Sequence, residues 1–401
     1  MTDNRTVLVE FSPSGGLFQF AAQLGAALAD RGEHVELWTG PDPEITSEEA
    51  RFLVRSVLPT WHPNDNDDAG GRLHYLLRRG TRAGRLVLAW LTLAVKLRRR
   101  PPRAVLFSQW RFTFEPWFVV AICKLLPRTV FAIVAHEPLP RSDAKDTSTP
   151  KQGHLLQASF AAAWRHMDAA FVLGPRTRQI VMEHWRPSCD VVVIPHGDSG
   201  VINRGRPVVP VTQTEPIALF FGTWTTYKGI DVLIEAFRRV KTGMPTARLV
   251  IAGAIGADVN GPELIAKAAA VGAETRPGYC AMDEVQNLFD SARVVVTPYI
   301  RASASGVAHL AYTFGRPVIG TTVGDLPAAI EDEVTGLLVP PNDPAMLATA
   351  ILKLLQNPQS AATLGEAGRA AVQRSWAVAA AAISNELTAA TELIGSTECE
   401  P

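Results

Sequence analysis

The sequence predicts an α/β fold built from two Rossmann-like, doubly wound domains that face each other across a cleft. At 401 residues the chain is longer than a single domain usually is. Short apolar strands alternate with amphipathic helices in two long series, as in parallel sheets covered by helices. Between the series the sequence is rich in Pro and Gly and has no periodicity, which is typical of a linker. We expect a first domain over residues 1–200, a linker over 201–215, a second domain over 216–375, and a C-terminal helix and tail over 376–401.

The overall composition argues against several classes of protein. The chain is 47% hydrophobic and 19% charged, which is typical of a globular protein, and its formal net charge of +0 gives no reason to expect nucleic acid as a partner. The cysteines lie far apart without metal-binding spacing, which favours a reducing compartment and argues against a structural zinc site. They are Cys123, Cys189, Cys280 and Cys399. The first residues lead directly into a strand without a signal-peptide pattern, and no apolar run reaches the roughly 18 residues of a spanning helix. We therefore expect a cytoplasmic protein.

The first domain is expected to open with a strand, a glycine-rich turn and a helix. A short apolar strand over 6–10 is followed by SPSGG, an amphipathic helix over 17–31 and a strand over 34–38. In such a βαβ unit the pair Gly15-Gly16 lies at the carboxyl edge of the sheet, where ligands bind. The pair does not complete the G-x-G-x-x-G pattern of dinucleotide sites. Glycine here indicates a close approach of the backbone, either to a ligand or to the helix itself.

The segment from Arg72 to Arg103 is strongly basic and has an apolar centre over 86–95. A basic helix with an apolar stripe, in which we place Trp90, can lie on an anionic membrane surface. The same pattern also fits an ordinary packed helix with a solvated basic end. The segment therefore has two interpretations, a peripheral membrane contact on the cytoplasmic face and a simple surface helix.

A histidine follows the end of a later strand in the first domain. The strand over 129–134 runs into a short segment that contains His136. A side chain at the carboxyl end of a parallel strand points into the ligand-binding crevice, which makes His136 a candidate for the site. A histidine held only by a neighbouring loop is the alternative. The other elements expected in this domain are strands over 104–108, 169–173 and 190–194 and helices over 117–126, 155–166 and 176–185.

Residues 294–320 of the second domain carry the most chemical information. They predict a strand over 294–297, a polar loop, a helix that opens near Ser305, and a strand from Pro317. A loop of small residues before a helix presents free amides and the positive end of the helix dipole, which suits a phosphate group. Simple capping of a buried helix by Ser303 and Ser305 is the alternative. The other elements expected in the rest of the chain are strands over 217–221, 248–252, 274–276 and 336–339 and helices over 229–240, 262–269, 282–289, 344–355, 359–374 and 376–393.

An ordered set of short motifs then points to a family. The motifs are Gly15-Gly16, Arg31-Gly32-Glu33-His34-Val35, His136-Glu137, Pro195-His196-Gly197, Phe221-Gly222, Tyr227-Lys228-Gly229-Ile230-Asp231, Leu249-Val250-Ile251-Ala252-Gly253, Gly278-Tyr279, Pro298-Tyr299, Gly315-Arg316-Pro317-Val318 and Thr335-Gly336-Leu337-Leu338-Val339-Pro340. In this order and spacing they resemble the GT-B glycosyltransferases of the large retaining family 4, also called group 1. The resemblance covers nearly the whole chain. It implies the GT-B fold, in which the C-terminal helix crosses back to the first domain.

The resemblance also implies a reaction and a set of site residues. These enzymes move a sugar from a nucleotide-diphosphate sugar, of UDP or GDP type, without a metal or cofactor and with retention of anomeric configuration. The leaving diphosphate must then be neutralised by cations and helix N-termini. By resemblance, His136 and Lys228 are the catalytic candidates. The candidates for donor binding are Gly15, Gly16, Thr223, Tyr279, Arg301, Ser303, Ser305, Gly306 and Val307.

The sequence departs from the family pattern beside the phosphate loop. The positions of two paired glutamates hold Ala302 and Leu310, a usual arginine is replaced by Thr223, and a usual glutamate by Ala328. Ser-Gly-Val at 305–307 with leucine at 310 resembles a branch that keeps the phosphate loop without the carboxylate contact to the sugar. Arg301 can supply the missing cation or be only solvated.

Two functions from different classes fit these observations, and a third interpretation is another GT-B-like sugar-nucleotide enzyme, such as an epimerase or a phosphorylase. The first is a glycosyltransferase that acts on a glycan, lipid-linked or small-molecule acceptor, as in polysaccharide biosynthesis. The second is a catalytically degenerate GT-B protein that binds or activates another transferase. The missing carboxylates favour the second function, whereas Lys228, His136 and the Ser-Gly-Val turn favour the first.

Overall fold

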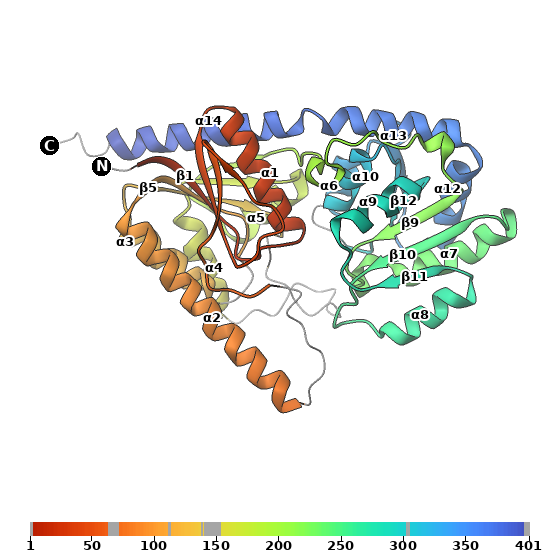
Figure 1. Cartoon of the computed structure of the whole chain (residues 1–401), viewed down its shortest axis with the longest axis horizontal. Helices are drawn as coiled ribbons and strands as arrows, with labels where there is room; N and C mark the ends of the chain where they lie inside the picture. Colours follow the sequence, from red (N-terminus) through yellow and green to blue (C-terminus); the bar gives the residue numbers. More distant parts are fainter. Residues whose placement is uncertain are drawn as a thin grey trace.

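The computed structural model describes residues 3–62, 72–110, 114–137, 139, 154–301 and 305–396. It contains two α/β units with one parallel-type sheet each, and the C-terminal helix runs along both (Figure 1). The α/β class and the two Rossmann-like domains predicted from the sequence are therefore confirmed. Ala302, Ser303 and Cys399 lie outside the described residues.

The sheet of the first unit has eight strands in the order β3-β4-β2-β1-β5-β6-β7-β8. All neighbours pair in parallel except β3 and β4, which are antiparallel. The strands are β1 (Asp3–Val9), β2 (His34–Thr39), β3 (Glu48–Glu49), β4 (Phe52–Ser56), β5 (Pro102–Phe107), β6 (Val130–Ala135), β7 (Ala169–Val172) and β8 (Val191–Val193). The sequence analysis predicted neither β3 nor β4. Strand β3 is only two exposed glutamates and offers no apolar alternation, and β4 is a short apolar run that ends in Arg55 and Ser56.

Helices cover both faces of this sheet, so its strands are apolar on both sides. The helices are α1 (Gly16–Asp30), α2 (Arg72–Arg99), α3 (Glu115–Leu125), α4 (His154–Arg165) and α5 (Pro175–His184). One core cluster joins the sheet to α2, α3 and α4, for example through Trp90, Val119 and Phe160. A second core cluster lies under α1 and the C-terminal helix.

The sheet of the second unit has six parallel strands in the order β11-β10-β9-β12-β13-β14. The strands are β9 (Ile217–Phe221), β10 (Arg248–Gly253), β11 (Glu274–Pro277), β12 (Val294–Thr297), β13 (Val318–Thr321) and β14 (Gly336–Val339). The helices are α7 (Ile230–Gly243), α8 (Gly261–Ala270), α9 (Met282–Ser291), α10 (Gly306–Thr313), α11 (Leu326–Ala329), α12 (Pro344–Gln356) and α13 (Pro358–Val372), and η2 (Thr226–Lys228) is a 3-10 turn. One core cluster spans this unit.

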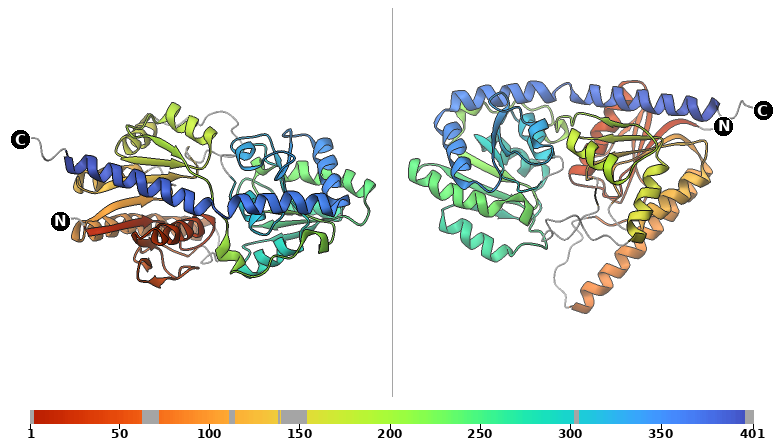
Figure 2. Two further views of the ribbon diagram at one scale, coloured as in Figure 1. Left: turned by 90° about the horizontal axis from the view of Figure 1, so that it is seen from above. Right: turned by 180° about the vertical axis from the view of Figure 1, so that it is seen from behind.

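Two connections join the units. The segment between the sheets contains two short helical turns, α6 (Gly200–Asn203) and η1 (Val211–Gln213). The last helix, α14 (Ser375–Ser396), runs from the second unit back over the first, where Ile383 and Leu387 enter the core (Figures 1 and 2). The predicted return of the C-terminal helix to the first domain is therefore confirmed.

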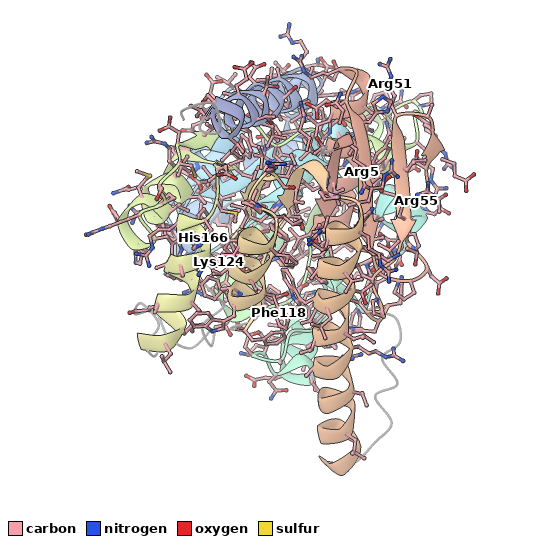
Figure 3. The ribbon with its side chains drawn as sticks, turned by 90° about the vertical axis from the view of Figure 1, so that its left-hand side faces the viewer. Arg5, Arg51, Arg55, Phe118, Lys124 and His166 are labelled. Carbon is pink, nitrogen blue, oxygen red and sulfur yellow. The ribbon has the colours of Figure 1, made fainter. Side chains whose placement is uncertain are left out.

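Helix α2 packs one face on the first unit and extends beyond it, with Phe118 and Lys124 of α3 at its side (Figure 3). Trp90 is fully buried, and its indole N–H donates to Glu115 Oε1 over 3.3 Å. The placement of Trp90 in a membrane-facing stripe was therefore wrong. The central run of α2 is apolar on both faces, so periodicity could not show which face meets the core. In the described part of the chain, no helix has the length and apolar character needed to cross a bilayer.

Candidate functional site

Helix α10 begins at the carboxyl edge of the second sheet, and no side chain among the described residues caps its first backbone amides. Ser305 precedes the helix with an extended backbone (φ −129°), and its side chain makes no capping hydrogen bond. Its Oγ lies instead 3.5 Å from Tyr299 Oη. The first amides of a helix have no partner within the helix. Gly306 is exposed and Val307 half-buried, so an anion can approach the positive end of α10.

Lys228 lies beside this helix start. It ends η2, and its Nζ is 5.4 Å from the centre of the Tyr299 ring. A Cβ at Gly222 would lie 2.8 Å from Lys228 Nζ and 3.9 Å from Val307 Cγ2. Gly222 has a φ of +123°, which also favours glycine. The structure therefore brings Lys228 and Val307 together around Gly222. Because Gly222 has no side chain, the lysine has room there.

The other donor-binding candidates of the second domain lie along the same edge of the sheet. Thr223 follows β9, Tyr279 follows β11 and Arg301 follows β12, and all three side chains are exposed. The Arg301 guanidinium lies over the ring of Tyr227, 5.8 Å from its centre. This stacking gives Arg301 a partner, so its side chain is more than a solvated loop residue.

The glycine pair of the first domain borders open space. Gly15 precedes α1 with a φ of +85°, and no heavy atom lies within 4 Å of a Cβ at Gly15 or Gly16. The described part of the chain therefore gives no sign that these glycines are needed for close helix packing. The Gly15 amide donates to Glu44 Oε2 over 3.0 Å, so a carboxylate already occupies this helix start.

His136 is connected to the second domain through aromatic rings. Its backbone amide donates to Gln109 Oε1 over 3.1 Å, and its ring meets the edge of Phe20 at 4.5 Å between centres. Phe20 belongs to α1 and also contacts His196, at 5.1 Å. His196 stacks on His309 of α10, at 4.5 Å. The contacts therefore run from the predicted cleft histidine to the predicted phosphate-binding helix.

The stacked pair of His196 and His309 was not predicted as part of the site. Each Nδ1 lies near a carbonyl oxygen, that of Gly197 at 2.8 Å and that of Ser305 at 3.1 Å. A carbonyl only accepts, so each neutral ring carries its proton on Nδ1. Burial lowers the pKa of His196 to about 4 and that of His309 to about 3, where the neighbouring His196 lowers the pKa further. Both rings are therefore neutral near pH 7.

His196 also stands close to the start of α10. A Cβ at Gly306 would lie 3.4 Å from His196 Nε2. The only signal in the sequence was the Pro-His-Gly motif, and nothing in it points to residue 309. By contrast Leu310, at the position of the second expected glutamate, is buried in the core. No residue of α10 is acidic.

Comparison with known proteins identifies the second domain. Residues 215–357 match the model of a family described as "Glycosyl transferases group 1". This match lies within the second half of the chain and covers most of the second domain. A protein from Corynebacterium aurimucosum named D-inositol 3-phosphate glycosyltransferase is 31% identical to this chain over 226 residues, which are 52% of this chain and 53% of that protein. The chain thus spans about half the length of the curated relatives it matches.

Solved structures of glycosyltransferases share the whole fold. Sucrose-phosphate synthase from Thermosynechococcus elongatus superposes with a TM-score of 0.70 at 21% identity, over 97% of this chain and 100% of that one. Anabaena Alr3699/HepE in complex with UDP-glucose gives a TM-score of 0.63 at 13% identity, over 98% of each chain. At such identities the likeness concerns the fold alone. The group 1 domain is therefore the second half of a GT-B architecture.

Proposed function

We propose that this protein is a glycosyltransferase that moves a sugar from a nucleotide-diphosphate sugar to an acceptor. The observation that carries the proposal is the open start of α10 with Lys228 beside it, inside a group 1 domain. An ammonium group and free helix amides neutralise a diphosphate, and their effect grows as negative charge develops on the leaving group.

The proposed transfer is metal-independent and retains the anomeric configuration. The bond between the anomeric carbon and the diphosphate oxygen breaks, and its electron pair goes to the diphosphate. The acceptor hydroxyl oxygen forms the new bond on the same face of the sugar, and its proton passes to that diphosphate oxygen. Lys228 and the amides of Gly306 and Val307 hold the diphosphate in this scheme. His136, at the end of β6, faces the sugar and the acceptor.

The proposed donor carries UDP or GDP, and no cofactor takes part. A structural neighbour holds UDP-glucose, which supports a uridine nucleotide. The proposed acceptor is a glycan, a lipid-linked sugar or a small molecule, and the name of the relatives adds a phosphorylated inositol as an example of the last class. In this scheme the exposed ring of Tyr279 contacts the base and Thr223 the phosphates.

A second candidate function has one observation in its favour. Leu310 is buried and apolar at the position where the resemblance expects a glutamate that contacts the sugar. A protein that binds a sugar nucleotide without turnover, as a partner of another transferase, would tolerate this loss.

Donor hydrolysis separates the two functions. Purified protein is incubated with UDP- and GDP-sugars without an acceptor, and release of the free nucleotide is measured beside thermal unfolding. A transferase is expected to hydrolyse one donor slowly and to be stabilised by it, by about 2.7 kcal/mol at about 100 times the Kd. Stabilisation without hydrolysis, also in the presence of cell-extract acceptors, supports the binding partner. Neither effect with any donor contradicts both.

We also propose that the protein works at the cytoplasmic face of a membrane. The motive is the basic segment from Arg72 to Arg103, whose helix α2 contains seven arginines and one lysine but no Asp or Glu. A peripheral contact would bring a lipid-linked acceptor to the site. Its test is whether transfer to an acceptor in anionic vesicles exceeds transfer to the same sugar in solution.

A further inference from the structure

The outer face of α2 carries large apolar side chains where a surface helix is usually polar. Leu77, Leu88, Leu91 and Val95 are spaced by eleven, three and four residues, so they form one stripe along the helix. Their exposed fractions are 63%, 53%, 50% and 50%. The core face is formed by other residues, namely Leu86, Ala89, Trp90, Leu93 and Leu97. Helix α2 is thus apolar on two opposite faces, and among the described residues only one of them packs on the core.

The neighbouring helix α3 extends this surface. The stacking of Trp90 on Phe118 and its hydrogen bond to Glu115 place the middle of α2 beside the first turns of α3. Trp117 of α3 points away from the core and is 52% exposed. A tryptophan at the edge of an apolar surface is typical of the boundary between lipid and water.

Basic side chains surround the apolar stripe. Arg85, Lys96, Arg98 and Arg99 of α2 and Lys124 and Arg128 beside α3 are all exposed. The whole chain has a formal net charge of +0, so this side concentrates positive charge that is balanced elsewhere.

We infer that the stripe of Leu77, Leu88, Leu91 and Val95, with Trp117 and the surrounding basic residues, docks on an anionic lipid bilayer. We refer to these residues as the α2–α3 face. Apolar side chains can enter the acyl boundary while the cations meet lipid phosphates. A second copy of the chain is a poorer occupant, because two such faces would bring like charges together. Since α2 cannot cross a bilayer, the contact lies in the plane of the membrane.

The α2–α3 face lies next to the first-domain side of the candidate site. Gln109, between β5 and α3, accepts from the amide of His136 and donates to the carbonyl of Glu137 over 2.9 Å. A bilayer docked on the α2–α3 face would therefore meet a helix, α3, whose leading segment is hydrogen-bonded to the loop with His136. This orientation would deliver a lipid-borne acceptor, and only that consequence rests on the proposed function.

Co-sedimentation with vesicles tests the inference in the absence of any nucleotide sugar. Wild-type protein is expected to bind phosphatidylcholine vesicles that contain phosphatidylglycerol and to bind pure phosphatidylcholine much less. The double variant Arg98→Glu/Arg99→Glu should reduce the partition coefficient by about 25-fold or more, since each basic residue near the surface contributes about fivefold. Leu88→Asn/Leu91→Asn should reduce it at least about tenfold.

Matched variants control for general effects of charge and polarity. Arg238→Glu/Arg239→Glu reverses two arginines of α7 with 65% and 51% exposed side chains. Val378→Asn/Leu393→Asn changes two exposed residues of α14. Both are expected to bind vesicles as the wild type does, and all variants should keep the wild-type circular dichroism spectrum.

Further outcomes decide against the inference. No binding, binding that is equal on neutral vesicles, or equal losses in the α2 and control variants would each overturn it, as would a dimer whose formation depends on Leu88 and Leu91. Brominated lipid should quench tryptophan fluorescence in the wild type and less in Trp117→Phe. If the protein hydrolyses a donor but does not bind vesicles, the inference about the α2–α3 face is refuted and the proposed glycosyltransferase function still stands.

Discussion

The starts of three helices, α1 and α5 in the first domain and α10 in the second, differ in what occupies them. In the first domain, the Gly15 amide of α1 donates to the carboxylate of Glu44. The amides of Arg176 and Thr177, at the start of α5, donate to Asp325 over 2.7 and 3.0 Å. At α10 of the second domain, no described side chain caps the helix, and Lys228 lies close by. Two positive helix ends are thus neutralised by the protein's own carboxylates, whereas no carboxylate among the described residues caps the start of α10.

The two internal carboxylates also differ from each other. Glu44 belongs to the same domain as α1 and is half-buried. Asp325 comes from the opposite domain, is 2% exposed, and also accepts from Thr177 Oγ1 over 2.5 Å. A Cβ at Gly174 would overlap Asp325, so glycine permits this approach. The cap on α5 therefore joins the domains, whereas the cap on α1 lies within one domain.

Removing Lys228, the cation beside the start of α10, should have the largest effect on donor turnover. Lys228→Ala is expected to reduce donor turnover by about 10²–10³-fold, because one charge-stabilising donor of the leaving group is lost. Turnover and thermal unfolding are measured together. Lys353→Ala, which removes an exposed lysine paired with Glu333, is the control and should be neutral. Unchanged turnover in Lys228→Ala would show that Lys228 does not stabilise the leaving diphosphate.

The buried neutral imidazoles of His196 and His309 predict a specific dependence of stability on pH. In the unfolded chain both pKa values are about 6.5, whereas the folded values are about 4 for His196 and about 3 for His309. Their stabilisation is complete above pH 6.5. As the pH falls toward 4, the unfolded state binds more protons and the free energy of unfolding decreases. Each histidine loses on the order of 2 kcal/mol at about pH 5, so the loss for the pair is on the order of 4 kcal/mol.

Denaturant unfolding near pH 7 and near pH 5 measures this loss. The variant His196→Gln/His309→Gln keeps side chains that can donate to the two carbonyls but do not titrate. It should lose less stability than the wild type over the same interval, by about the amount assigned to the pair. An equal loss in both proteins would show that the two histidines titrate normally.

Removing the Asp325 carboxylate, which caps α5 from the opposite domain, should lower the free energy of unfolding moderately. Asp325→Ala leaves the buried start of α5 without its acceptor, at an expected cost of about 2 kcal/mol in unfolding free energy. It should also speed proteolysis of the linker over 201–215. The matched change is Asp343→Ala, which removes the cap of α12 within one domain, where Asp343 accepts from Ala345 and Met346. That variant should lose about 1 kcal/mol and leave linker cleavage unchanged. Equal cleavage in both would mean that Asp325 does not hold the domains.

The sequence predicted those features of the helix starts that depend on neighbouring residues. The alternation of strands and helices, the start of α10 and the position of Lys228 before α7 all follow from neighbouring residues. The caps could not be predicted in the same way, because Asp325 and Arg176 are 149 residues apart in the sequence. The stacking of His196 on His309 likewise requires the fold to bring two segments together. The face of α2 that meets the core could not be predicted for a different reason. Trp90 and Leu91 are both apolar, and only packing distinguishes them.

The smallest expected effect tests whether α1 contributes to donor binding at all. Glu44→Gln keeps an acceptor for the Gly15 amide but removes the negative charge that competes with a diphosphate. A charge at a helix start contributes about 0.3–1 kcal/mol, so UDP is expected to bind about two- to fivefold more tightly, with a slightly lower free energy of unfolding. Glu48→Gln, on the exposed strand β3, makes the same charge change away from the helix and should leave UDP affinity unchanged. Calorimetric titration with UDP measures both variants. If Glu44→Gln loses stability without any gain in affinity, the diphosphate does not reach α1, and the predicted roles of Gly15 and Gly16 fail while that of α10 remains.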